Sequence, residues 1–99
     1  MTRQDIDIDE YWKVIVVYNV ELGEFNAGFT QTDFTKRRSI VGIGKATSKE
    51  QFLNTIVHEA KHVQSHICKY YKVDEDSEDA AYLIGYIIQK MYSTFKNMI

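Results

Sequence analysis

The sequence of 99 residues contains no proline, one cysteine and five glycines. Because proline and glycine are the main breakers of helices and strands, their scarcity permits long secondary-structure elements. The single cysteine, Cys68, excludes an internal disulfide and favours a reducing compartment. No apolar run approaches the roughly 20 residues that a membrane-spanning helix needs.

Neither sign of charge dominates the chain. Twelve basic and fourteen acidic side chains give a formal net charge of −2, which excludes a global basic field that would gather nucleic acid or anionic lipid. The first ten residues are polar and acidic and lack the apolar stretch of a secretory signal. Together with the lone cysteine, this predicts a cytoplasmic protein that makes no use of a membrane.

The composition predicts a single α+β domain over residues 1–99, with sheet-forming segments before about residue 47 and helix-forming segments after it. Residues 1–10 are expected to be a loose lead-in. Runs of β-branched and aromatic residues predict strands at 11–20, 25–30 and 39–44. Because the connections are short, we expect antiparallel neighbours. The prediction is a small antiparallel sheet of about three strands within residues 11–44.

Two long helices are expected after the sheet. Ser48 followed by Gln51 forms a capping box, and apolar residues at helical spacing continue to about residue 71, which predicts a helix over 48–71. An acidic stretch then breaks the pattern, and a second helix is predicted over 77–98. Because few residues join them, the helices should pack as a hairpin against the sheet. The buried face of the second helix should include Ala81, Leu83, Ile84, Ile87, Ile88, Met91 and Phe95.

The first predicted helix carries the pattern His58-Glu59-Ala60-Lys61-His62. Residues four apart nearly eclipse on a helix, so two imidazoles on consecutive turns can bind one Zn²⁺ ion. Glu59 is offset from the two ligands but can reach a metal-bound water and take its proton. The alternative is a helix that carries two histidines and a solvated glutamate without a metal.

A catalytic zinc site needs a third protein ligand. His66 lies about 12 Å along the helix axis from His58, which is too far for one ion to bind both together with His62. Cys68 falls on the opposite side of the helix and is expected to be a small core residue. The remaining candidates are the acids of the following segment, namely Asp74, Glu75, Asp76, Glu78 and Asp79.

Among these acids we favour Glu78 because it begins the second helix. Ala81 and Gly85 follow it on the same helix face, and such small residues let two backbones approach closely. The alternative is that Glu78 only complements the helix dipole. An EF-hand calcium loop in this acidic stretch is not expected, because its glycine and closing glutamate are missing.

His58-Glu59-x-x-His62, followed by a helix with Glu78-x-x-Ala81, resembles the gluzincin branch of zinc metallopeptidases, most closely the compact zincin-like versions of phage and mobile elements. The resemblance implies His58, His62 and Glu78 as ligands of one Zn²⁺ ion and Glu59 as general base. It also implies a strand bordering the cleft, for which residues 39–44 are the natural candidate. Many gluzincins carry an acid where this chain has Tyr82. That tyrosine, or Tyr70 or Tyr71, could steady the oxyanion instead.

The predicted function is hydrolysis of peptide bonds in a peptide or protein substrate. The first alternative is a non-catalytic module that zinc stabilises and that binds a protein partner. The second is a metal-free interaction domain. Full-size gluzincins have a second lobe of which this chain has almost none, and a protein partner or a homo-oligomer could complete the cleft. The basic cluster Lys36-Arg37-Arg38 is expected to be a solvated loop, and nucleic acid is not an expected partner.

Overall fold

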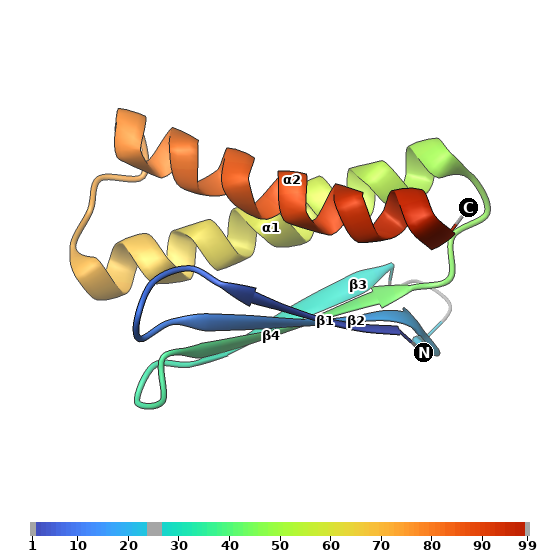
Figure 1. Ribbon diagram of the computed structural model, residues 1–99, viewed down its shortest axis with the longest axis horizontal. Coiled ribbons are helices and arrows are strands. Elements are labelled where there is room, and N and C mark those ends of the chain that lie inside the picture. The colour runs from blue at the N-terminus through green and yellow to red at the C-terminus, as the bar shows by residue number, and fades with distance from the viewer. Residues whose placement is uncertain (1, 24–26, 99) are drawn as a thin grey trace.

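The computed structural model describes residues 2–23 and 27–98 of the chain. One layer is a four-stranded sheet, and the other is a hairpin of two long helices (Figure 1). The predicted α+β class and the helix hairpin are therefore confirmed. In chain order the elements are β1 (Thr2–Asp7), β2 (Lys13–Val20), β3 (Gly28–Asp33), β4 (Arg38–Gly44), α1 (Lys49–Tyr71) and α2 (Glu78–Met98).

The sheet is mixed, with strand order β1-β2-β4-β3. The two hairpins, β1 with β2 and β3 with β4, are antiparallel as expected, but β2 and β4 pair in parallel. The predicted small sheet of about three strands is roughly confirmed by the four strands observed, and only the expectation of wholly antiparallel pairing is wrong. The physical reason lies in burial, because β2 and β4 carry most of the inward apolar residues and take the centre of the sheet. The polar strands β1 and β3 take its edges.

The predicted loose lead-in is wrong, because Thr2–Asp7 forms strand β1. It pairs with β2 along its whole length, and its inward side chain Ile6 is 2% exposed. The outer face of this strand carries charged arginine and aspartate side chains, so the composition of the segment did not predict a strand. The predicted strand at 25–30 is shifted to Gly28–Asp33, and residues 25–26 lie outside the described residues.

Both predicted helices form, with ends set by local hydrogen bonds. Ser48 is the N-cap of α1, and its side-chain oxygen accepts from the Gln51 N–H at 3.1 Å. The helix ends at Lys72, whose left-handed backbone lets its N–H donate to the Cys68 carbonyl. Ser77 precedes α2, and its hydroxyl accepts from the Ala80 N–H at 3.2 Å. Within residues 2–23 and 27–98, neither helix is both long and apolar enough to cross a membrane.

The core lies between the sheet and the helices, and α1 covers β3 and β4 while α2 covers β1. The inner face of the second helix differs by a small rotation from the predicted one. Ala80 is 1% exposed, whereas Ala81 faces solvent. Ile87 and Met91 are buried as predicted, and the Phe95 side chain lies outside the described part of the structure. Partly buried residues at the core margin are Ile8, Leu83, Ile84 and Ile88.

The Ile87→Ala substitution tests this packing. Ile87 is fully buried, so its truncation leaves a cavity between α2 and the sheet and should lower the free energy of unfolding by about 2–5 kcal/mol. Urea denaturation measures the change. Leu53→Ala is the control, because that side chain is 42% exposed and should cost much less. Equal losses in the two variants would contradict the assignment of the core.

Candidate metal centre

His58 and His62 lie on the exposed side of α1 and face each other across one helical turn. Their Nε2 atoms are 3.2 Å apart, and their ring centroids are 4.8 Å apart. The helix is held in this rotation by Ile56, Ala60 and Val63, which are all fully buried. The two imidazoles therefore converge at the surface, as the spacing of the motif predicts.

The nitrogen pair has the span that one zinc ion requires. Zinc binds imidazole nitrogen at about 2.0–2.1 Å in tetrahedral geometry, so two such nitrogens lie about 3.3–3.4 Å apart. The observed 3.2 Å between the Nε2 atoms of His58 and His62 is close to this value. The 3.2 Å contact is a hydrogen bond between the two rings, and its length is near the spacing that two ligands of one metal ion need.

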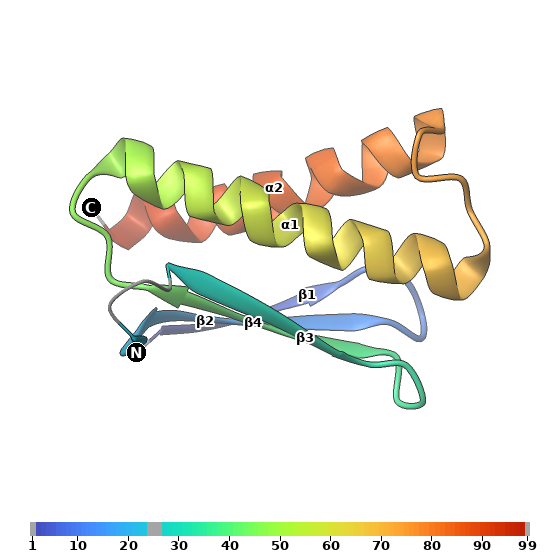
Figure 2. The ribbon, with the colours of Figure 1, turned by 180° about the vertical axis from the view of Figure 1, so that it is seen from behind.

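Glu59 points to the other side, toward the sheet. Its side chain is buried, with 4% exposure, and the Thr30 hydroxyl donates to its Oε1 at 2.7 Å. Thr30 belongs to β3, which runs beneath α1 (Figure 2). The candidate base is thus held by a strand, one residue along the helix from the first histidine.

The strand next to the motif helix is β3, not the predicted segment 39–44. That segment is β4, which has β2 on one side and β3 on the other and so offers no free edge. The expectation that residues 39–44 border the cleft is wrong, because the β3–β4 hairpin places its first strand outside. The free main-chain groups beside the histidine helix belong to β3.

The structure does not bring Glu78 or Tyr82 to the histidine pair. Glu78 is exposed, and Tyr82 is 71% exposed on the outward face of α2. A Cβ built on Gly85 would meet no atom within 4 Å, so the small residues of this face border open space rather than α1. The helices pack through Ala80 instead, which turns the Glu78 face away from the hairpin interface.

The other sequence candidates also have separate roles. Glu75 accepts from the Ser65 hydroxyl at 2.9 Å and pairs with Lys61 at 3.4 Å, and these hydrogen bonds hold the pKa of its carboxyl below the usual value. Cys68 is a buried core residue as expected, and burial raises the pKa of its thiol. Among residues 2–23 and 27–98, no three His, Cys, Asp or Glu side chains are placed to hold one ion.

His66, expected to lie too far from His58 to share an ion, is tied to the sheet by a chain of hydrogen bonds. Its Nδ1 lies 2.7 Å from the Thr32 hydroxyl, which lies 2.9 Å from the Ser39 hydroxyl. The indole N–H of Trp12 donates to Ser39 at 3.2 Å. Thr30 and Thr32 are thus the residues that sequence reasoning missed. Their signal was the alternation of two threonines along a strand that faces the motif helix.

The direction of these hydrogen bonds determines the protonation state of the His66 imidazole. The Trp12 indole can only donate, so the fully buried Ser39 hydroxyl accepts from it. The Ser39 proton then needs an acceptor, which is the Thr32 hydroxyl. Thr32 in turn donates its own proton to His66 Nδ1. This arrangement needs a neutral imidazole. Burial, with smaller contributions from His62 and Lys69, also lowers the pKa of His66.

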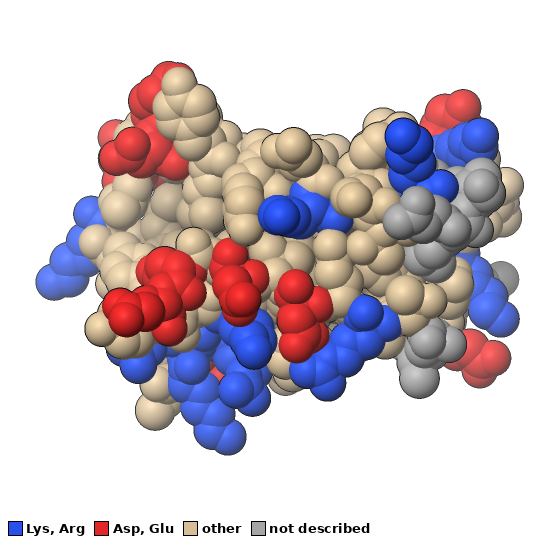
Figure 3. Space-filling model, in the orientation of Figure 1, with Lys and Arg blue, Asp and Glu red and all other residues tan. Residues whose placement is uncertain are grey.

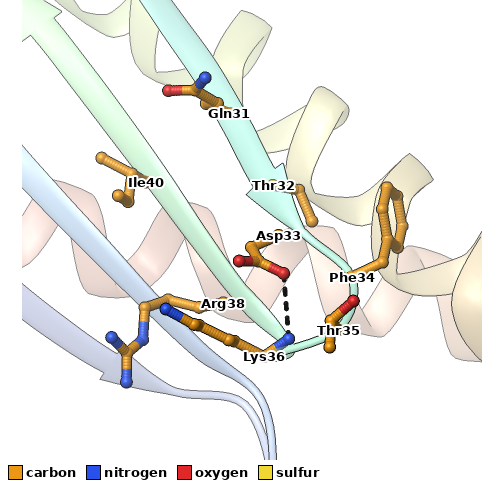
Figure 4. A pocket seen from close by; sticks show the side chains of 8 residues that line it. All are labelled: Gln31, Thr32, Asp33, Phe34, Thr35, Lys36, Arg38 and Ile40. Atoms are coloured by element: carbon orange, nitrogen blue, oxygen red, sulfur yellow. Dashed lines mark hydrogen bonds between the residues drawn. The ribbon is translucent and has the colours of Figure 1, made fainter.

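The basic cluster lies away from this site, at the turn between β3 and β4. A hollow of about 650 Å³ is lined there by Lys36, Arg38 and Asp33, whose carboxylate accepts from the Lys36 N–H (Figure 4). The Arg37 guanidinium lies 4.9 Å above the centre of the Tyr11 ring. Figure 3 shows basic side chains along the lower edge of the molecule with a row of acidic ones above them. Lys36 and Arg38 are exposed, as a solvated cluster requires, whereas Arg37 is partly buried and its Nε has no hydrogen-bond partner within the described residues.

Comparison with models of known protein families, with curated proteins and with solved structures finds no match to this chain.

The His66 imidazole should titrate below the ordinary histidine value of about 6.5. Because the folded chain resists protonation there, the stability that neutral His66 provides is lost as the pH falls from about 6.5 through the folded pKa. NMR of the ring protons measures the midpoint. The same residue in urea-unfolded chain is the control, and a folded midpoint at or above that control would contradict the hydrogen-bond direction.

Proposed function

We propose that this chain is a small zinc-dependent hydrolase of peptide bonds. His58 and His62 hold the ion, and Glu59 acts as the general base. The observation that carries the proposal is the convergence of the two Nε2 atoms at 3.2 Å, close to the spacing of two nitrogens on one zinc ion. Glu59 stands at the sequence position of the acid in the HExxH pattern, although its side chain is turned toward the sheet.

The residues around the pair have distinct tasks in this proposal. Bound zinc lowers the pKa of a coordinated water toward neutrality and polarises a carbonyl. The Glu59 carboxylate takes a proton from the attacking water and returns it to the leaving amine. The Thr30 hydroxyl, which donates to Glu59 at 2.7 Å, holds that carboxylate toward the sheet, so Glu59 must turn away from Thr30 to reach the water. The free edge of β3 offers main-chain groups to which an extended peptide substrate can bind as an added strand.

A second candidate is a non-catalytic metal module that binds a protein partner. The observation that favours it is the state of Glu59, which is 4% exposed and already bonded to Thr30. A base must reach the water that it deprotonates, and a carboxylate committed to the fold does not do so without moving. The two candidate functions differ in whether the Glu59 carboxylate takes part in hydrolysis.

A reducing, cytoplasmic setting is part of the same proposal. The thiol of Cys68 is 1% exposed and its pKa is raised by burial, so it keeps its proton and resists oxidation. Such a buried thiol suits any compartment, so the cytoplasmic setting and the phage or mobile-element type are proposed from the single cysteine and the HExxH resemblance alone.

Glu59→Gln should retain zinc and lose hydrolysis by about 10²–10⁴-fold, because the amide can still accept from Thr30 but cannot take a proton. Cleavage of a quenched peptide library by the zinc-loaded protein measures the rate. Glu50→Gln is the matched control, since Glu50 is an exposed acid in the first turn of α1. If Glu59→Gln cleaves as fast as the parent protein, Glu59 is not the base. No cleavage by the parent itself favours the non-catalytic candidate.

His58→Asn and His62→Asn should each weaken zinc binding by more than about tenfold, because each removes one of the two converging nitrogens. Calorimetric titration with zinc measures the affinity. Glu78→Ala is the control for loss of an exposed acid and should leave the affinity unchanged. A loss in Glu78→Ala as large as in the histidine variants would make Glu78 a ligand after all.

A further inference from the structure

We infer that one zinc ion can join two copies of this chain, with His58 and His62 of each copy filling all four of its positions. The inference rests on the histidine pair of the proposed function and adds to it a partner and a means of regulation. Its starting point is the number of ligands that one chain supplies. Within the described ranges, no third His, Cys, Asp or Glu joins the pair.

An ion held by two nitrogens has two tetrahedral positions left, which water, substrate or further side chains must fill. A second histidine pair fills both with the ligand that zinc accepts readily, at the same spacing of 3.2 Å. A twofold axis through the ion supplies that pair from an identical surface. The contact is therefore self-complementary, as symmetric dimers require.

The surface of α1 around the pair allows such an approach. His58 and His62 are both exposed, and Asn54, one turn before His58, is exposed and uncharged. The nearest cation in sequence, Lys61, is directed away from the pair. Its Nζ donates to Gln64 Oε1 at 2.8 Å and lies 3.4 Å from the Glu75 carboxylate. No fixed positive charge of Lys61 therefore opposes the ion.

The geometry of the ion sets the geometry of the dimer. Opposite edges of a tetrahedron are perpendicular, so two copies of α1 that each supply one edge cross at about 90°. Helices that cross so steeply touch over a short length and bury little surface. The metal bonds, rather than side-chain packing, hold such a dimer together. The metal-free protein is then expected to be a monomer.

This bridge would also control the hydrolytic site. A zinc ion with four histidine ligands would have no open position for a water or a substrate. Excess zinc gives each chain its own ion and separates the two copies. The bridged dimer is thus the closed state of the site, and the singly loaded monomer is the open state.

A zinc titration of the full chain, followed by analytical ultracentrifugation with zinc uptake measured in parallel, tests the inference. We expect the measured mass to double as zinc rises to half an equivalent per chain and to return to that of the monomer at large excess of zinc. Addition of EDTA to the dimer should also give the mass of the monomer. His58→Asn and His62→Asn should abolish the doubling. Because both side chains are exposed, these variants should fold normally, which circular dichroism checks.

Asn54→Tyr separates bridging from binding. The added ring lies one turn before His58, on the face that a second helix would approach, and obstructs that helix without replacing either ligand. This variant should bind one zinc per chain as tightly as the parent protein and form at least tenfold less dimer at half an equivalent. Asn54→Ala, which adds no bulk, is the matched control and should dimerise like the parent protein.

Three results would overturn the inference, and they are distinguishable. Zinc uptake of one ion per chain with a constant monomer mass removes the bridge and leaves the proposed function standing. No zinc uptake at any ratio removes both. A dimer that persists in EDTA, or in the two histidine variants, places the contact on another surface of the protein.

Discussion

The rotation of α1 about its own axis is the constraint on which the candidate site depends. Ile56, Ala60, Val63 and Ile67 form a buried stripe that sets this rotation against the sheet. Because adjacent helical residues differ by about 100°, the same rotation turns His58 and His62 to solvent and Glu59 into the sheet. A core of ordinary apolar packing thereby places the two histidines and the acid between them in the sequence on different sides of the helix.

The strand order determines which side chains of the sheet meet the inward polar residues of α1. Since β4 pairs with β2, β3 is left as the edge strand beside α1, and its inward residues are threonines rather than apolar residues. Thr30 satisfies the buried carboxylate of Glu59, and Thr32 satisfies His66. Without these hydroxyls, two polar groups would lose hydrogen bonds at the margin of the core, a cost of about 1–3 kcal/mol for each buried group. The polar side of α1 is therefore matched residue by residue to one strand.

Local patterns predicted the helices well and the sheet less well. The Ser48 cap, the end of α1 near Tyr71 and the start of α2 after Ser77 all follow from signals within a few residues. The parallel pairing of β2 with β4 depends on which strands bury most side chains, and no local signal carries it. The same limit applies to the site. The spacing of His58 and His62 was enough to predict that they meet. The placement of Glu78 depends on which face of α2 packs inward. That face contains Ala80 and not the neighbouring Ala81, so Glu78 points away from α1.

The parallel pairing of β2 with β4 has a further consequence for the architecture. One half of the molecule is a contiguous ββα segment from Gly28 to Tyr71, and it contains both histidines of the pair, Glu59 and the two threonines. The other half is assembled from the two ends of the chain, β1 and β2 with α2, joined by the bond from the Gln4 side chain to the Lys90 carbonyl. The residues of the candidate site thus lie in one uninterrupted stretch of chain, and the segments from the two chain ends pack against it and support it.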